Sequence, residues 1–226
     1  MTTNIILAEG VNRSFPISGG KPFHALKDIK LSVPENSLTI LKGRSGSGKT
    51  TLINILGALD LPNSGKISIC GSEITSISER KRENIRRKNI GYVFQSVSLI
   101  PMMSAFENVE FALRLAGIRK DRKKRVEECL KMVGLGGRMH HMPQELSGGE
   151  QQRVAIARAV AHNPKVVFAD EPTAELDSVT SVAVVNLFKE MVKNQGITIV
   201  MTTHDVSLMD AGDFVYELED GELKDV

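Results

Sequence analysis

The sequence predicts an α/β fold built on a parallel central sheet. Two apolar runs, residues 166–169 and 197–201, have the length and composition of strands that are buried on both faces. A third run, 38–41, leads into a glycine-rich turn and then into residues 50–59, whose apolar side chains recur at helical spacing. Strands that alternate with helices in this way form parallel sheets covered by helices.

The remaining elements follow from the same patterns. Near the N-terminus, segments 5–8 and 29–33 are typical of strands separated by turn residues, and further strands are expected at 66–70 and 90–94. Between 104 and 134 the apolar spacing becomes helical, and another helix is expected at 149–162. The basic stretch 119–125 contains no aromatic residue, so a solvated helix face is favoured over a nucleic-acid site.

The composition is that of an ordinary globular protein. The 226 residues are enough for one domain, and 29 Lys and Arg against 27 Asp and Glu leave a net charge of +2, which does not indicate a nucleic-acid partner. No segment reaches the roughly 18 to 20 apolar residues of a membrane-spanning helix, so we expect a cytoplasmic protein that does not insert into the membrane. Cys70 and Cys129 lack paired spacing, which argues against a disulfide framework or a metal site.

Residues 43–50 have the pattern of a phosphate-binding loop, Gly43-Arg44-Ser45-Gly46-Ser47-Gly48-Lys49-Thr50, between a predicted strand and a predicted helix. The glycines allow successive N–H groups to face one anion, and the helix start adds its positive dipole end. Lys49 can reach the β and γ phosphates of ATP, and the Thr50 hydroxyl can bind Mg²⁺. The next residue, Thr51, is also expected to contact the nucleotide.

Two acids follow the strand predicted at 166–169. Asp170 is expected to hold Mg²⁺ through water, and Glu171, which faces differently, to orient and deprotonate the water that attacks the γ phosphate. Alone, such a pair would be more typical of a helix cap. The phosphate loop in the same chain favours the catalytic interpretation.

A second motif, Leu146-Ser147-Gly148-Gly149-Glu150-Gln151-Gln152-Arg153, resembles the signature sequence of ABC ATPases, and the resemblance extends over residues 15–204. It implies the ABC-ATPase fold of phosphate-loop NTPases, with an N-terminal antiparallel β-subdomain. The nucleotide-binding core is then expected at 1–95 and 161–226, and an inserted helical subdomain at 96–160. In the family, the residues that begin the signature helix contact the γ phosphate held by a second chain. A head-to-tail homodimer therefore encloses two ATP molecules. In this sequence the matching residues are Ser147, Gly148, Gly149 and Glu150.

The resemblance also implies roles for single residues. Gln95 matches the glutamine that touches Mg²⁺ or the attacking water, and His204 matches the switch histidine at the γ phosphate. Asp177 matches the acid of a loop that crosses the dimer interface. Phe15 stands where the family usually has an adenine-stacking tyrosine, and Glu175 stands where close relatives commonly have a small or amide residue.

Residues 59–65, 90–95 and 104–109 resemble the subfamily that serves macrolide export, lipoprotein release, antimicrobial-peptide resistance and division-site control. This implies an ATP-hydrolysing subunit on the cytoplasmic face of the membrane that powers a separate integral membrane permease. The permease's cytoplasmic helix is expected beside Gln95, on an apolar group made of Val97, Leu99, Ile100, Met102 and Met103. For each of these residues taken singly, packing in the core is an equally open alternative.

Two other functions share these motifs. DNA-repair and chromosome-organising ATPases share both motifs but separate them by long coiled coils, whereas only about 50 residues without sustained heptads lie between 95 and 146. A regulatory ATPase that signals to a membrane partner without moving a substrate would need the same ATP chemistry, so the sequence leaves it open.

Overall fold

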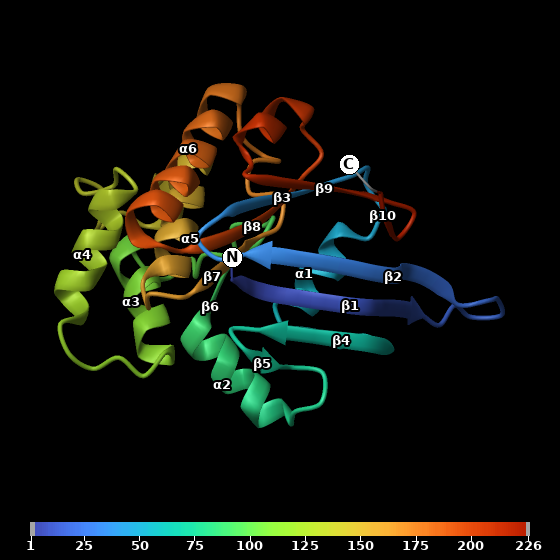
Figure 1. Cartoon of the computed structure of the whole chain (residues 1–226). Helices are drawn as coiled ribbons and strands as arrows, with labels where there is room; N and C mark the ends of the chain where they lie inside the picture. The colour runs from blue at the N-terminus through green and yellow to red at the C-terminus, as the bar shows by residue number, and fades with distance from the viewer. Residues whose placement is uncertain (1–2, 225–226) are drawn as a thin grey trace.

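The computed structural model describes residues 3–224 and contains two sheets (Figure 1). The larger sheet has six strands in the order β10-β9-β3-β8-β7-β6. Neighbours from β9 to β6 are parallel, and only the pair of β9 and β10 is antiparallel. This confirms the predicted parallel sheet, whose strands are β3 (Leu38–Lys42), β6 (Ile90–Val93), β7 (Val166–Ala169), β8 (Thr198–Thr203), β9 (Phe214–Glu219) and β10 (Glu222–Lys224).

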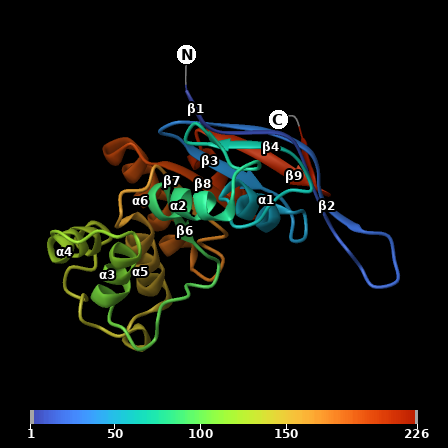
Figure 2. The same ribbon diagram turned by 90° about the horizontal axis from the view of Figure 1, so that it is seen from below.

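The smaller sheet is antiparallel and has the order β2-β1-β4-β5. Its long strands β1 (Asn4–Phe15) and β2 (Phe23–Pro34) form a hairpin whose turn projects from the body of the molecule (Figure 2). The other strands are β4 (Ser64–Ile69) and β5 (Ser72–Glu73). An antiparallel sheet in the N-terminal part of the chain was expected, and the structure confirms it.

Helices cover both faces of the parallel sheet. The helices are α1 (Lys49–Leu56), α2 (Glu79–Asn89), α3 (Ala105–Leu115), α4 (Arg122–Met132), α5 (Gly148–Val160) and α6 (Ser178–Gln195), with short 3₁₀ turns at Pro143–Glu145 and Val206–Ala211. Figure 2 shows α3, α4 and α5 gathered at one side of the molecule. Within residues 3–224, no helix combines the length and the apolar character needed to cross a bilayer.

The core follows from the alternation of side chains along the buried strands. On β7, Val167 and Ala169 pack into a cluster that includes the inner faces of α3 to α6. Val166 and Phe168 point to the opposite face, into a cluster with α1 and the antiparallel sheet. The parallel sheet is therefore buried on both faces, which is why its strands have continuous apolar sequences.

Some elements were not predicted. Helix α2 contains no buried residue, so it lacks the apolar periodicity that reveals a helix. The helix α6 and the terminal strands β9 and β10 were also missed.

The basic stretch 119–125 is only partly a solvated face. Helix α4 begins at Arg122, whose guanidinium donates to Glu110 of α3 at 3.2 Å. Arg125 donates to the carbonyls of Val160 and Ala161 at the end of α5. Arg122 and Arg125 therefore join α4 to α3 and α5. The prediction that the whole stretch is a solvated face was wrong for these two residues.

Candidate active site

The candidate site lies along one edge of the parallel sheet. The carboxyl ends of β3, β8, β7 and β6 lie side by side in that order. The phosphate loop follows β3, His204 follows β8, the acid pair follows β7, and Gln95 lies in the loop after β6. Because parallel strands end at the same edge, residues far apart in sequence meet there.

The loop after β3 curls over the start of α1. Gly48 precedes the helix with a φ of 106°, and a Cβ at this position would lie 2.5 Å from the Ala25 carbonyl oxygen. No side chain caps this helix start, so the N–H groups of the first turn face the loop interior. Thr50 is exposed at the mouth of the loop, and Thr51 is half-buried.

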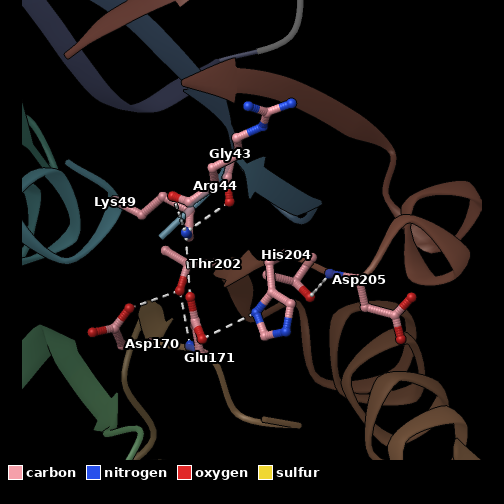
Figure 3. A network of polar contacts seen from close by, with 9 residues as sticks. Gly43, Arg44, Lys49, Asp170, Glu171, Thr202, His204 and Asp205 are labelled. Carbon is pink, nitrogen blue, oxygen red and sulfur yellow. Dashed lines mark hydrogen bonds and ion pairs between the residues drawn. The ribbon is translucent and has the colours of Figure 1, made fainter. Parts of the chain in front are cut away.

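The Lys49 ammonium lies inside the loop and is almost fully buried. It donates to the carbonyl oxygens of Gly43 at 2.8 Å and Arg44 at 3.0 Å. Its third neighbour is a carboxylate oxygen of Glu171, at 3.2 Å (Figure 3). All three ammonium protons therefore have acceptors within the chain.

The acid pair is held by the neighbouring strand β8. The Thr202 hydroxyl donates to Asp170 Oδ1 at 2.7 Å and accepts the backbone N–H of Glu171 at 2.8 Å. Glu171 has a φ of 42°, so the chain turns sharply between the two acids. As a result Asp170 faces Thr202, whereas Glu171 faces Lys49 and His204 (Figure 3).

His204 extends from the end of β8 toward the same carboxylate. Its Nδ1 lies 3.2 Å from Glu171 Oε2, and its ring is largely exposed. The two residues line a cleft of about 290 Å³ together with Thr173, Ala174, Leu176, Ser178, Ser181, Thr203 and Asp205. Glu171 thus lies between the phosphate-loop cation and the histidine, with an open cleft beside it.

Two expected nucleotide contacts lie apart from this network. Gln95 is exposed in the loop after β6 and makes no side-chain hydrogen bond within residues 3–224. Phe15 ends β1 with 37% of its surface exposed. The Arg13 guanidinium lies over one face of its ring, 4.7 Å from the centroid, which leaves the other face for a stacking partner.

The signature residues cap α5 at a distance from the phosphate loop. The Ser147 hydroxyl accepts the Glu150 N–H, and the Glu150 carboxylate accepts the Ser147 N–H at 2.8 Å, which forms a capping box. These hydrogen bonds to the Ser147 backbone and side chain lower the pKa of Glu150. Ser147 and Gly148 are exposed, and Gly149 is half-buried where α5 approaches Thr180 of α6.

Asp177 caps α6. Its carboxylate accepts hydrogen bonds from the Thr180 hydroxyl at 2.7 Å and from the Thr180 N–H at 3.0 Å, and these lower its pKa. Glu175 is exposed in the preceding loop. Asp177 therefore has a structural role inside this chain, in addition to the interface position that the resemblance implies.

The donor set expected for Mg²⁺ consists of oxygen atoms, which are the ligands this ion prefers. Thr50 is an exposed residue at the start of α1 and carries a hydroxyl. The second carboxylate oxygen of Asp170 is not used by Thr202, and Gln95 offers an amide oxygen. These residues fit a hydrated ion that shares its remaining positions with phosphate oxygens.

Thr202 is a site residue that the sequence pattern did not predict. Strand β8 contains three threonines, Thr198, Thr202 and Thr203, and the sequence does not distinguish the one whose hydroxyl reaches the acid pair.

A phosphate loop, an acid pair and a histidine on the carboxyl edge of a parallel sheet define a phosphate-loop NTPase. The family model for ABC transporters matches residues 26–174. The chain belongs to this family and is an ATPase of it.

Relatives cover nearly the whole chain. An uncharacterized ABC transporter ATP-binding protein of Thermotoga maritima is 44% identical over 203 residues, which are 89% of this chain and 86% of that protein. The macrolide export ATP-binding/permease protein MacB of Bartonella henselae is 40% identical over 97% of this chain, which corresponds to 33% of MacB. The solved dimer of the ATP-binding cassette MJ0796 of Methanocaldococcus jannaschii, bound to ADP and Pi, has a TM-score of 0.89 at 38% identity and covers 97% of each chain.

Proposed function

We propose that this ATPase works as a head-to-tail homodimer that encloses two ATP molecules and powers an integral membrane permease. The observation that carries the proposal is the separation of two anion-binding helix starts within one chain. The start of α1 lies in the phosphate loop, whereas the exposed start of α5 bonds only to its own capping box and neighbours within residues 3–224. A second chain would bring the two starts to opposite sides of one triphosphate.

The catalytic proposal assigns a task to each group of the network. Lys49 binds the β and γ phosphates, and Glu171 orients the attacking water and accepts its proton. His204 contacts the γ phosphate and touches Glu171, so it links the phosphate to the base. Mg²⁺ held by Thr50, Asp170 and Gln95 would neutralise negative charge on the phosphates.

Roles at the dimer interface are proposed for the signature residues and for Asp177. Ser147, Gly148, Gly149 and Glu150 form the α5 start that would face the γ phosphate of the partner. The base of ATP would stack on the free face of Phe15. We also propose that residues 96–160 act as a helical subdomain on a core made of 1–95 and 161–226, because α3, α4 and α5 pack on one another.

The sandwich is tested by assembly state. Glu171→Gln should bind MgATP without cleaving it, so the closed dimer should accumulate and elute as a dimer in size-exclusion chromatography. Adding Ser147→Arg should abolish that dimer by filling the anion site, while Ser72→Arg, on exposed β5, should leave it intact. A Glu171→Gln protein that stays monomeric with MgATP at high concentration would contradict the sandwich for the isolated chain.

The permease is proposed to dock beside α3. A groove of about 450 Å³ runs between α2, β6, α3 and α5, and exposed apolar side chains of Leu59, Phe94 and Leu115 line it. Arg86, Arg87, Arg158 and His162 line it too, so its charged rim is mainly basic. This combination suits an amphipathic cytoplasmic helix that presents apolar side chains together with an acidic residue.

Most of the apolar group expected next to Gln95 packs partly beneath the surface and is not freely available to a partner. Met102 alone is strongly exposed, at 85%, whereas Val97, Leu99, Ile100 and Met103 are partly buried. The fully buried Asn108 side chain donates to the carbonyls of Ile100 and Met103, and so holds Met102 outward. Docking of the permease would keep the chain peripheral on the cytoplasmic face of the membrane.

A further inference from the structure

A buried hydroxyl lies behind the acid pair. Thr202, on β8, is fully buried, and its Oγ1 donates to Asp170 Oδ1 at 2.7 Å. The same oxygen accepts the backbone N–H of Glu171 at 2.8 Å (Figure 3). One hydroxyl therefore holds the side chain of one acid and the backbone of the other.

The bond to the Glu171 backbone continues the sheet beyond its last ladder pair. The registered pairing of β7 with β8 ends at Ala169 and Met201, and the Asp170 N–H donates to Val93 on the opposite neighbour β6. Glu171 then adopts a left-handed φ of 42°, which is unfavourable for a residue other than glycine. A side-chain acceptor on β8 gives its N–H a partner and stabilises this turn.

The turn determines where the two carboxylates go. Asp170 keeps one oxygen on Thr202 and has the other free for a hydrated ion. Glu171 lies on the other side of the turn, with its oxygens 3.2 Å from Lys49 and 3.2 Å from His204. If the hydroxyl were absent, both the rotamer of Asp170 and the backbone at Glu171 would lose a constraint.

We infer that Thr202 is a positioning residue for ATP hydrolysis, which orients the Asp170 carboxylate and holds the backbone turn at Glu171. The inference rests on the roles proposed above for these two acids. Thr202 itself is fully buried within β8, so it would act through its two partners rather than by touching nucleotide.

The neighbouring strand offers a matched control. Thr39 of β3 is also fully buried, in register with Val200, and its hydroxyl has no hydrogen-bond partner within the described part of the chain. Valine has the shape of threonine without the hydroxyl. Thr39→Val and Thr202→Val therefore remove the same atom from the same sheet, but only the second change removes hydrogen bonds to the acids.

The test compares Thr202→Val, Thr202→Ser and Thr39→Val by steady-state ATPase kinetics and by Mg²⁺ titration of the activity. Thr202→Val should lower kcat about 10- to 100-fold, which is the usual effect of removing a hydrogen bond to a metal-ligating side chain. It should also raise the Mg²⁺ concentration needed for half-maximal activity, while ATP binding in EDTA stays unchanged. Thr202→Ser, which keeps the hydroxyl, should restore most of the activity, and Thr39→Val should resemble the parent protein.

A Thr202→Val protein with the parent kcat and Mg²⁺ dependence would overturn the inference, and so would an equal loss in Thr39→Val. If Thr202→Val does not fold, Thr202→Cys replaces it, because a thiol fills the site but is a weak hydrogen-bonding group. Parent activity in Thr202→Cys would then overturn the inference. Parent-like hydrolysis by Glu171→Gln would instead refute the proposed base, whereas an inactive Glu171→Gln beside a fully active Thr202→Val would refute only the positioning role.

Discussion

The Lys49 ammonium lies 3.2 Å from the Glu171 carboxylate, so the proposed phosphate-binding cation and the proposed catalytic base form an ion pair with each other. Both groups are largely buried. In the proposed mechanism, bound ATP would compete with Glu171 for Lys49, and loss of this cation neighbour would make the carboxylate a better acceptor for a proton from water. The pair offers a physical reason why the base would act only when nucleotide is bound.

Lys49→Ala should weaken MgATP binding about 10- to 100-fold, because a charge-assisted hydrogen bond contributes about 1.5–3 kcal/mol. Isothermal titration calorimetry measures the change. Lys42→Ala is the control, since it removes the same charge one residue before the loop, where Lys42 pairs with Glu217 at 2.8 Å. Equal affinities in the parent and Lys49→Ala would mean that the loop does not bind phosphate as proposed.

Glu171→Gln should lower the hydrolysis rate by about 10²- to 10⁴-fold, the usual contribution of a positioned general base. Affinity for MgATP should be retained or increased, because Lys49 loses its internal carboxylate partner and no charge repels the triphosphate. Phosphate release and nucleotide affinity are measured on the same preparation. Glu190→Gln, on the exposed face of α6, removes an equal charge and should hydrolyse ATP normally.

Leu115→Glu should weaken permease binding about 30-fold or more, because a charge in an apolar docking groove removes a central contact worth about 2 kcal/mol. Leu115 is 61% exposed, so folding and ATPase activity should be unaffected. Copurification with the permease measures the effect, and Ile17→Glu, at an exposed position in the hairpin turn, is the control.

Met102→Glu distinguishes a docking surface on the loop after Gln95 from one in the groove beside α3. If Met102→Glu releases the permease while Leu115→Glu does not, the partner contacts the loop after Gln95 rather than the groove. Loss of binding in both variants supports one continuous surface. Loss of ATP binding in either variant would contradict the assignment of that residue to a docking surface separate from the nucleotide site.

His162 should make stability depend on pH. Burial lowers the pKa of this histidine below its usual value near 6.5, and its Nε2 donates to the Ile90 carbonyl at 3.0 Å. Because the unfolded chain binds the proton more readily, the free energy of unfolding is highest above about pH 6.5 and falls as the pH drops toward the lowered pKa. Urea unfolding at pH 7.5 and pH 5.5 measures this loss, which should be smaller in His162→Gln; an equal loss in both proteins would contradict the assignment.

Local pattern predicted much of the fold. The phosphate loop requires glycines, a lysine and a helix start within eight residues, so its chemistry is visible without any tertiary contact. The buried strands were equally visible, since burial on both faces makes them apolar throughout. Helix α2 was not visible, because a helix with no buried face carries no apolar period.

The sequence by itself determined the class of protein and the identities of most candidate site residues. Only the tertiary structure decided which of them meet: Lys49 with Glu171, Glu171 with His204, and the Thr202 hydroxyl with both acids. The pairings depend on strand order and register, which place β8 between β3 and β7. They also depend on a left-handed turn at Glu171 that no propensity favours. These contacts join residues 31 to 122 positions apart. They arise from packing of the whole sheet, and packing is a property of the folded chain rather than of any local segment.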